Sequence, residues 1–213
     1  MAYRWVAASV AGFVQQLAVG YIARGYYFYV AGRIPENKDP ARTDAKIMAQ
    51  YGIGVSKWVR ARRKKAGVAN VHYLRHERFF VLIANHGEQP FFAAEASQLR
   101  DVRVSPIRFR GYAIGCRQAR HGGAFHVSVR IHRETYRELK SRFERMSVQR
   151  SVDDLCRELQ AIHYEPYAPV RDQLGGLVRA INRRRKQGGL EAVPASAFRR
   201  TRRPVRPFAP SSR

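Results

Sequence analysis

Two apolar runs separated by a short polar segment, between Val71 and Gly87, constrain the fold more than any other feature of the sequence. Residues 71–74 and 79–84 have the length and residue types of β-strands, and the Arg-His-Glu-Arg segment between them has the polarity and length of a turn. The stretch therefore predicts a tight antiparallel hairpin rather than a histidine active site. Its histidines have different places: His72 on the polar face of the first strand, His76 at the turn and His86 in the exit loop.

A second hairpin is predicted over residues 107–131, with a basic, glycine-containing loop at 118–123. In its second strand, apolar residues alternate with polar ones from Phe125 to Ile131, which is typical of a half-buried strand. A further strand is predicted at 25–33, a segment rich in Tyr, Phe and Val. The three segments predict one antiparallel sheet of about five strands, made of two hairpins plus an N-terminal strand.

Residue patterns typical of helices lie between and after these strands along the sequence. Asp39 and Pro40 can begin a helix that ends near Tyr51, and a second helix follows at 55–65 with Trp58 as its apolar anchor. Three further helices are predicted. They cover residues 134–146, the segment that begins after the cap Ser151, and residues 169–186. The expected fold is an α+β domain over residues 1–187, with helices packed on one face of the sheet and the other face left for a ligand. Residues 188–213, rich in Pro and Arg, are expected to form a basic tail that is disordered when free.

The charge indicates the class of partner. The chain has 40 Lys+Arg against 16 Asp+Glu, a formal net charge of +24, and such a surplus is best neutralised by a polyanion. DNA or RNA is the first candidate. Membrane insertion of the uncharged segment 5–23 is disfavoured, because Gln15 and Gln16 interrupt it and its spacing suits an amphipathic helix on a core. Two cysteines without a disulfide framework favour a cytoplasmic protein.

Aromatic and basic residues are expected to share the open sheet face, where bases stack on rings and guanidinium groups hold phosphate. The basic helix and the tail add phosphate contacts, which give affinity without sequence specificity. The candidate nucleic-acid-binding residues are Tyr27, Tyr29, Arg33, Lys57, Arg60, Arg62, Arg63, Lys64, Lys65, His72, Arg108, Arg110, Tyr112, Arg130, Arg183, Arg184, Arg185, Arg199, Arg200, Arg202 and Arg203.

The leading hypothesis is therefore a nucleic-acid-binding protein, with membership of a bacterial mobile-element or replication system as an additional hypothesis. One alternative is an enzyme that cleaves phosphodiesters, and another is a ribosome-associated structural protein that binds RNA. The catalytic candidates for the enzyme are His121, His126, Tyr112 and Tyr136. No cofactor or metal site is expected from the sequence, and a divalent metal is implied only by the nuclease alternative.

In layout alone, the expected sheet with helices resembles single-strand DNA endonucleases of the rolling-circle and tyrosine-transposase type. That resemblance implies a His-hydrophobic-His metal motif on a strand and a tyrosine nucleophile on a helix. Here His72 is followed by Tyr73 and Leu74, so the metal-binding pair is missing. The chain also resembles metal-independent ribonucleases of ferredoxin-like build, in its basic loop with Gly122 and Gly123.

Overall fold

The computed structural model describes residues 3–119 and 122–208, which form an α+β fold with two antiparallel sheets. The chain divides into two compact units. Unit 1 comprises Met1–Ile107, Ile114–Val127 and Val205–Arg213, and unit 2 comprises Arg108–Ala113 and Ser128–Pro204. The predicted domain of residues 1–187 therefore contains parts of both units.

Unit 1 is built on a four-stranded antiparallel sheet in the order β2-β3-β1-β4. Its strands are β1 (Tyr26–Arg33), β2 (Val71–His76), β3 (Phe79–Asn85) and β4 (Arg100–Asp101). β2 pairs with β3 in the register that places Leu74 opposite Val81, so the predicted first hairpin is confirmed. Glu77 in its tight turn has a φ of 51°.

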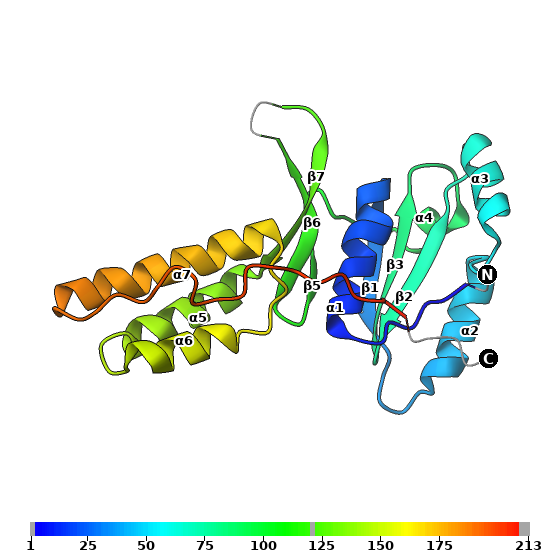
Figure 1. The fold of residues 1–213 in the computed structure, drawn as a ribbon. Coiled ribbons are helices and arrows are strands. Elements are labelled where there is room, and N and C mark those ends of the chain that lie inside the picture. The colour runs from blue at the N-terminus through cyan, green and yellow to red at the C-terminus, as the bar shows by residue number, and fades with distance from the viewer. Residues whose placement is uncertain (1–2, 120–121, 209–213) are drawn as a thin grey trace. The chain divides into compact units, whose positions relative to one another are not determined.

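Helices cover both faces of this sheet, whereas the sequence predicted helices on one face (Figure 1). On one face lie α2 (Pro40–Gln50) and α4 (Pro90–Ala94), and the Tyr73 hydroxyl donates to Asp44 of α2 at 2.7 Å. On the other face lies a continuous helical segment made of α1 (Val10–Gln15), the π-helix η1 (Gln16–Tyr21) and the 3-10 helix η2 (Ile22–Arg24). Its Phe13 and Tyr21 contact His76 and His72, at ring distances of 6.3 and 4.6 Å.

The N-terminal segment thus packs on the sheet as an amphipathic helix, as its spacing predicted. Phe13, Val14, Leu17, Ala18 and Tyr21 are buried there. Nowhere in residues 3–119 and 122–208 does a helix combine the length and the apolar character that crossing a membrane requires.

Asp44 anchors α2 to the sheet. The helix begins as predicted, with Asp39 accepting from the amides of its first turn and Pro40 at the first position. One turn later the Asp44 carboxylate is 2% exposed and accepts from Trp5, Tyr73 and Arg75 at 2.7 to 3.0 Å. A buried carboxylate requires such partners, because desolvation strongly disfavours an unpaired charge.

A second sheet has the order β5-β6-β7, and its residues are shared between the two units. Its strands are β5 (Ile107–Phe109), β6 (Tyr112–Gln118) and β7 (Phe125–Ile131). The predicted second hairpin is present as β6 and β7, in its own sheet rather than beside the first. Its expected first strand is divided into β5 and β6 by a turn at Arg110 and Gly111, so Arg108, Arg110 and Tyr112 do not share one strand. β4, of two residues, and β5, of three, are too short to show an alternating pattern in the sequence.

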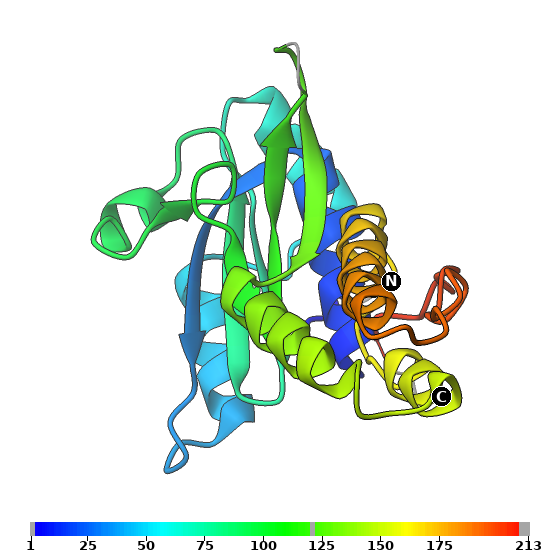
Figure 2. The ribbon, with the colours of Figure 1, turned by 90° about the vertical axis from the view of Figure 1, so that its left-hand side faces the viewer.

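Unit 2 also contains α5 (Arg133–Met146), α6 (Val152–Gln160) and α7 (Ala168–Gln187), which follow one another along the chain (Figure 2). Ser151 caps α6 as predicted, accepting from the Asp154 amide at 3.1 Å. The Tyr136 hydroxyl of α5 donates to the Gln173 carbonyl of α7 at 2.9 Å. Leu155, Leu174 and Leu177 are among the buried apolar residues of this unit.

Residues 188–208, predicted to be disordered, have defined positions against the folded units. In unit 2 the Asn182 side chain exchanges two hydrogen bonds of 2.8 Å with the backbone of Val193, and Phe198 is buried. In unit 1 the Gln15 side chain binds the backbone of Val205. The sequence did not predict these contacts because the tail has only a few apolar residues among many arginines and prolines. Residues 209–213 lie outside the described part.

Candidate nucleic-acid interface

The basic helix predicted at 55–65 is α3 (Lys57–Lys65), whose sequence KWVRARRKK contains six cations and no acid. Ser56 caps it by accepting from the Val59 amide at 3.3 Å. One side of the helix is held to unit 1 by arginines that bind carbonyl oxygens: Arg60 donates to Val55 and Arg63 to Gly52. These two arginines are half-buried and position the helix.

The other side of α3 is open to solvent. Lys57, Trp58, Arg62, Lys64 and Lys65 are exposed, and none of these four cations takes part in an ion pair within the described residues. Trp58 is 75% exposed, with the Lys57 ammonium 5.0 Å from its ring centre. The sequence assigned Trp58 to the core as the helix anchor, and this was wrong. We call these five residues the α3 surface.

Three candidates for base stacking or base contact on an open sheet face are instead buried. Tyr29 is 2% exposed with its hydroxyl 3.0 Å from the Ser105 carbonyl, and Tyr112 is 1% exposed. His72 is 8% exposed. These side chains cannot offer a surface to a base. The Tyr21 ring of η1 covers His72, and the Tyr164 ring packs against Tyr112 at 4.9 Å.

His72 lies inside an aromatic cluster. Its ring stacks near Tyr21 at 4.6 Å and Tyr3 at 5.9 Å, and meets Tyr26 edge-on at 4.9 Å. Its Nδ1 atom is buried and has no hydrogen-bond partner among the described residues. Burial, followed by the positive charges of Arg60 and Arg24, lowers the pKa of His72 to about 3, so the ring is neutral at physiological pH.

The other sheet candidates of unit 1 are Tyr27 and Arg33. Tyr27 is half-buried, with the Arg103 guanidinium 4.8 Å from its ring centre. Arg103 is itself fixed by Asp101 through hydrogen bonds of 2.6 to 3.0 Å. Arg33 is exposed and lies 3.6 Å from Glu36. The negative charge of these partners weakens the attraction of both arginines for phosphate.

The candidates in unit 2 separate into surface and structural residues. Arg108, Arg110, Arg183 and Arg184 are exposed, and Arg130 is half-buried. Arg185 is 4% exposed and donates to the carbonyls of Ser147 and Arg150 at 2.7 and 2.9 Å. Its guanidinium therefore joins α7 to the segment after α5 and is not available to a ligand.

The tail arginines also differ in whether they have partners. Arg199 pairs with Glu165 at 2.6 Å, and the Arg202 guanidinium lies 4.8 Å from the ring centre of Tyr167. Arg200 and Arg203 are exposed. The tail therefore adds a few accessible cations rather than the uniform basic segment that the sequence suggested.

In the described part of unit 2, no hydrogen bond joins the catalytic candidates Tyr112 and Tyr136 to each other. His121 lies outside the described residues, and His126 is exposed. The Tyr112 hydroxyl accepts from the Glu165 amide at 2.7 Å, and burial raises the pKa of both Tyr112 and Tyr136, which opposes their use as nucleophiles. Over residues 3–119 and 122–208, no group of three His, Cys, Asp or Glu side chains is placed to bind a metal.

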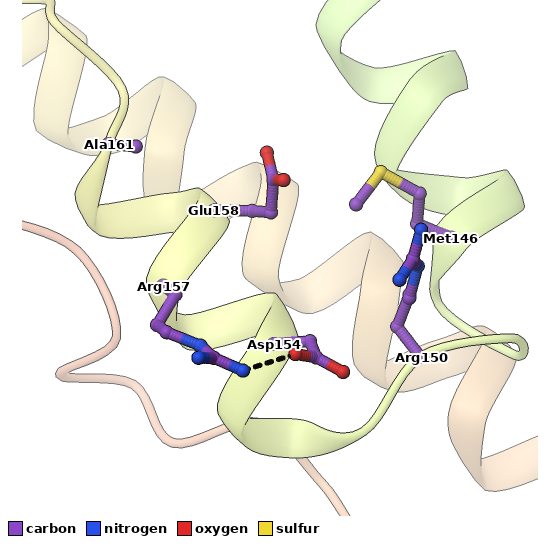
Figure 3. Close-up of a pocket in the computed structure, with 6 residues that line it drawn as sticks. All are labelled: Met146, Arg150, Asp154, Arg157, Glu158 and Ala161. Atoms are coloured by element: carbon purple, nitrogen blue, oxygen red, sulfur yellow. Dashed lines mark hydrogen bonds and ion pairs between the residues drawn. The ribbon is translucent and has the colours of Figure 1, made fainter.

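A pocket of about 460 Å³ lies in unit 2 (Figure 3). Figure 3 shows Arg157 reaching the carboxylate of Asp154, one turn earlier on α6. A second acid of the lining, Glu158, is bound by Arg142 at 2.6 Å. Because its acids are already paired, the pocket has no unpaired carboxylate for a cationic ligand, and Arg150 is the remaining charged residue of the lining. The full lining is Met146, Arg150, Asp154, Arg157, Glu158 and Ala161.

The α3 surface thus brings four accessible cations together with an aromatic ring that is 75% exposed. Its aromatic member could be found in the sequence only as a lone Trp inside a basic run, a pattern that a buried helix anchor shares. Comparisons of the chain with protein-family models, with curated proteins and with solved structures give no match.

Proposed function

We propose that this protein binds nucleic acid and that the α3 surface is its primary contact. The observation that carries the proposal is the exposure of Trp58 among four cations that have no acidic partner in the described part of the chain. Unpaired cations on a folded surface attract a polyanion, because each phosphate that they neutralise releases counterions. A ring that is 75% exposed gains by stacking on a base.

This arrangement favours single-stranded nucleic acid. Bases in a duplex are stacked on one another, whereas unpaired bases offer their faces to an aromatic side chain. The four cations contact phosphates without reading sequence. Both DNA and RNA carry these groups, so both are included in the proposal.

The intrinsic fluorescence of Trp58 tests the contact directly. The chain has two tryptophans, and the other, Trp5, is bound to Asp44 inside unit 1. Adding a single-stranded oligonucleotide is expected to quench the wild-type emission, and the Trp58→Phe variant is expected to lose that response. Quenching that persists in Trp58→Phe would place the contact elsewhere.

Charge removal tests the phosphate contacts. The triple variant Arg62→Gln/Lys64→Gln/Lys65→Gln is expected to lower affinity and to reduce the slope of log affinity against log salt by about 0.7 for each lost contact with a single strand. The matched control is Lys38→Gln/Arg42→Gln/Lys46→Gln, which removes the same charge from exposed positions at α2. Equal effects of the two triples would show that only net charge matters, and would overturn the assignment to α3.

A further inference from the structure

A second, apolar pocket of about 480 Å³ opens on the surface of unit 1, within the range of about 300–1,000 Å³ typical of small-ligand sites. Its walls are aromatic: the Phe28 and Phe92 rings lie 5.5 Å apart at 84°, and His86 lies 6.4 Å from Phe28. Its rim carries the exposed side chains of His86 and Glu88. The lining residues are Phe28, His86, Gly87, Glu88, Gln89, Phe92, Ala93 and Leu99.

This pocket is joined to the end of α3 by backbone hydrogen bonds. The Glu88 amide donates to the Gly67 carbonyl at 2.9 Å, and the Ala69 amide donates to the Glu88 carbonyl at 3.0 Å. Gly67 in turn donates to Lys64, in the last turn of α3. The rim of the pocket is therefore fixed beside the most basic end of the α3 surface.

Gly87 permits this close approach. Its φ is +139°, and a Cβ atom there would lie 2.5 Å from the Gly67 carbonyl oxygen. A side chain at this position would push the rim away from the segment that follows α3.

We propose that the pocket receives an unstacked nucleobase of the strand whose phosphates contact the α3 surface. The inference rests on the proposed function and extends it, because it adds a site for bases to a surface for phosphates. Aromatic walls stack on or pack against a base. Glu88 favours a base over a phosphate as the occupant, since its carboxylate repels phosphate and can accept from a base amino group. The Glu88 side chain makes no hydrogen bond or ion pair within the described residues.

The test compares two oligonucleotides of equal length and charge, one with bases and one abasic, in binding to the full-length protein. Ala93→Phe fills the pocket from an exposed position on α4 without removing core atoms. Ala94→Phe is the matched control, because Ala94 is also exposed on α4 but does not line the pocket. A second variant, Phe92→Ala, removes one aromatic wall.

Ala93→Phe and Phe92→Ala are expected to lower affinity for the base-containing strand by about 5- to 150-fold, the range for loss of one stacked base. Affinity for the abasic strand, and both affinities of Ala94→Phe, are expected to stay at the wild-type values. If wild type binds both strands and Ala93→Phe binds them as wild type does, the base pocket is refuted while the proposed function stands. An equal loss for both strands would also refute it. Wild type that binds neither strand would refute the proposed function itself.

Discussion

Replacing His72 by Phe is expected to remove an acid sensitivity of unit 1. His72 is neutral in the folded protein, with a pKa of about 3 against an ordinary value of 6.5 in an unfolded chain. Burial is the main cause, and the nearby charges of Arg60 and Arg24 act in the same direction. The other titratable groups that face the ring are the hydroxyls of Tyr3, Tyr21 and Tyr26, which stay protonated at acid pH.

The sign and size of the effect follow from proton linkage. Above pH 6.5 the ring is neutral in both states and does not affect the pH dependence of stability. Below pH 6.5 the unfolded chain binds a proton that the folded chain does not, so the free energy of unfolding falls by about 1.4 kcal/mol per pH unit until the pH approaches the folded-state pKa. At pH 4.5 the loss amounts to about 2–3 kcal/mol. His72→Phe keeps an aromatic ring in the cluster but has no proton to bind.

Urea unfolding measured between pH 7.5 and 4.5 tests this. In a Trp58→Phe background the fluorescence of Trp5, bound to Asp44, reports on unit 1 alone. The difference in unfolding free energy between His72→Phe and its parent should shift by about 2–3 kcal/mol in favour of the variant as the pH falls from 7.5 to 4.5. A difference that stays constant over this range would mean that His72 protonates as easily in the folded protein as in the unfolded chain, and would refute the reasoning.

Two further changes test the structure of unit 1. Asp44→Ala removes the acceptor of Trp5, Tyr73 and Arg75, and leaves the Arg75 guanidinium, 12% exposed, without its carboxylate partner. The unfolding free energy is expected to fall by about 3–5 kcal/mol, which urea unfolding followed by circular dichroism measures. Gly87→Ala is expected to lower the melting temperature more than the control Gly54→Ala. Both positions have positive φ, but only at position 87 would the added Cβ meet backbone atoms. Equal losses of melting temperature would contradict the close approach to Gly67.

Local signals in the sequence predicted the elements but not how they pack. Asp39 and Ser151 cap the expected helices, and the hairpin of β2 and β3 forms where the polar turn was seen. These features depend on a few neighbouring residues. Whether a strand face stays open depends instead on helices distant in the chain. The tilted ring contact between Phe13 and His76 joins residues that no local pattern connects.

The sequence likewise does not show which cations are accessible to a ligand. A guanidinium has five donors in a rigid fork, so a folded chain can use it to bind carbonyl oxygens as readily as to bind phosphate. Arg78 donates to the carbonyls of Pro35, Glu36 and Lys38, and Arg185 holds those of Ser147 and Arg150. Such arginines stand in the same runs as accessible ones: Arg185 follows the exposed Arg184, and Arg63 follows the exposed Arg62.

The formal charge of +24 therefore overstates the surface available to a polyanion. A cation already bonded to carbonyl oxygens would give up those bonds, and leave buried acceptors unpaired, before it could turn to a phosphate. Arg62, Lys64 and Lys65 have no such bonds within the described residues, so their whole interaction with phosphate is available for binding. For this reason the salt dependence of binding should report the few accessible cations of α3, and should fall far below what the net charge alone would suggest.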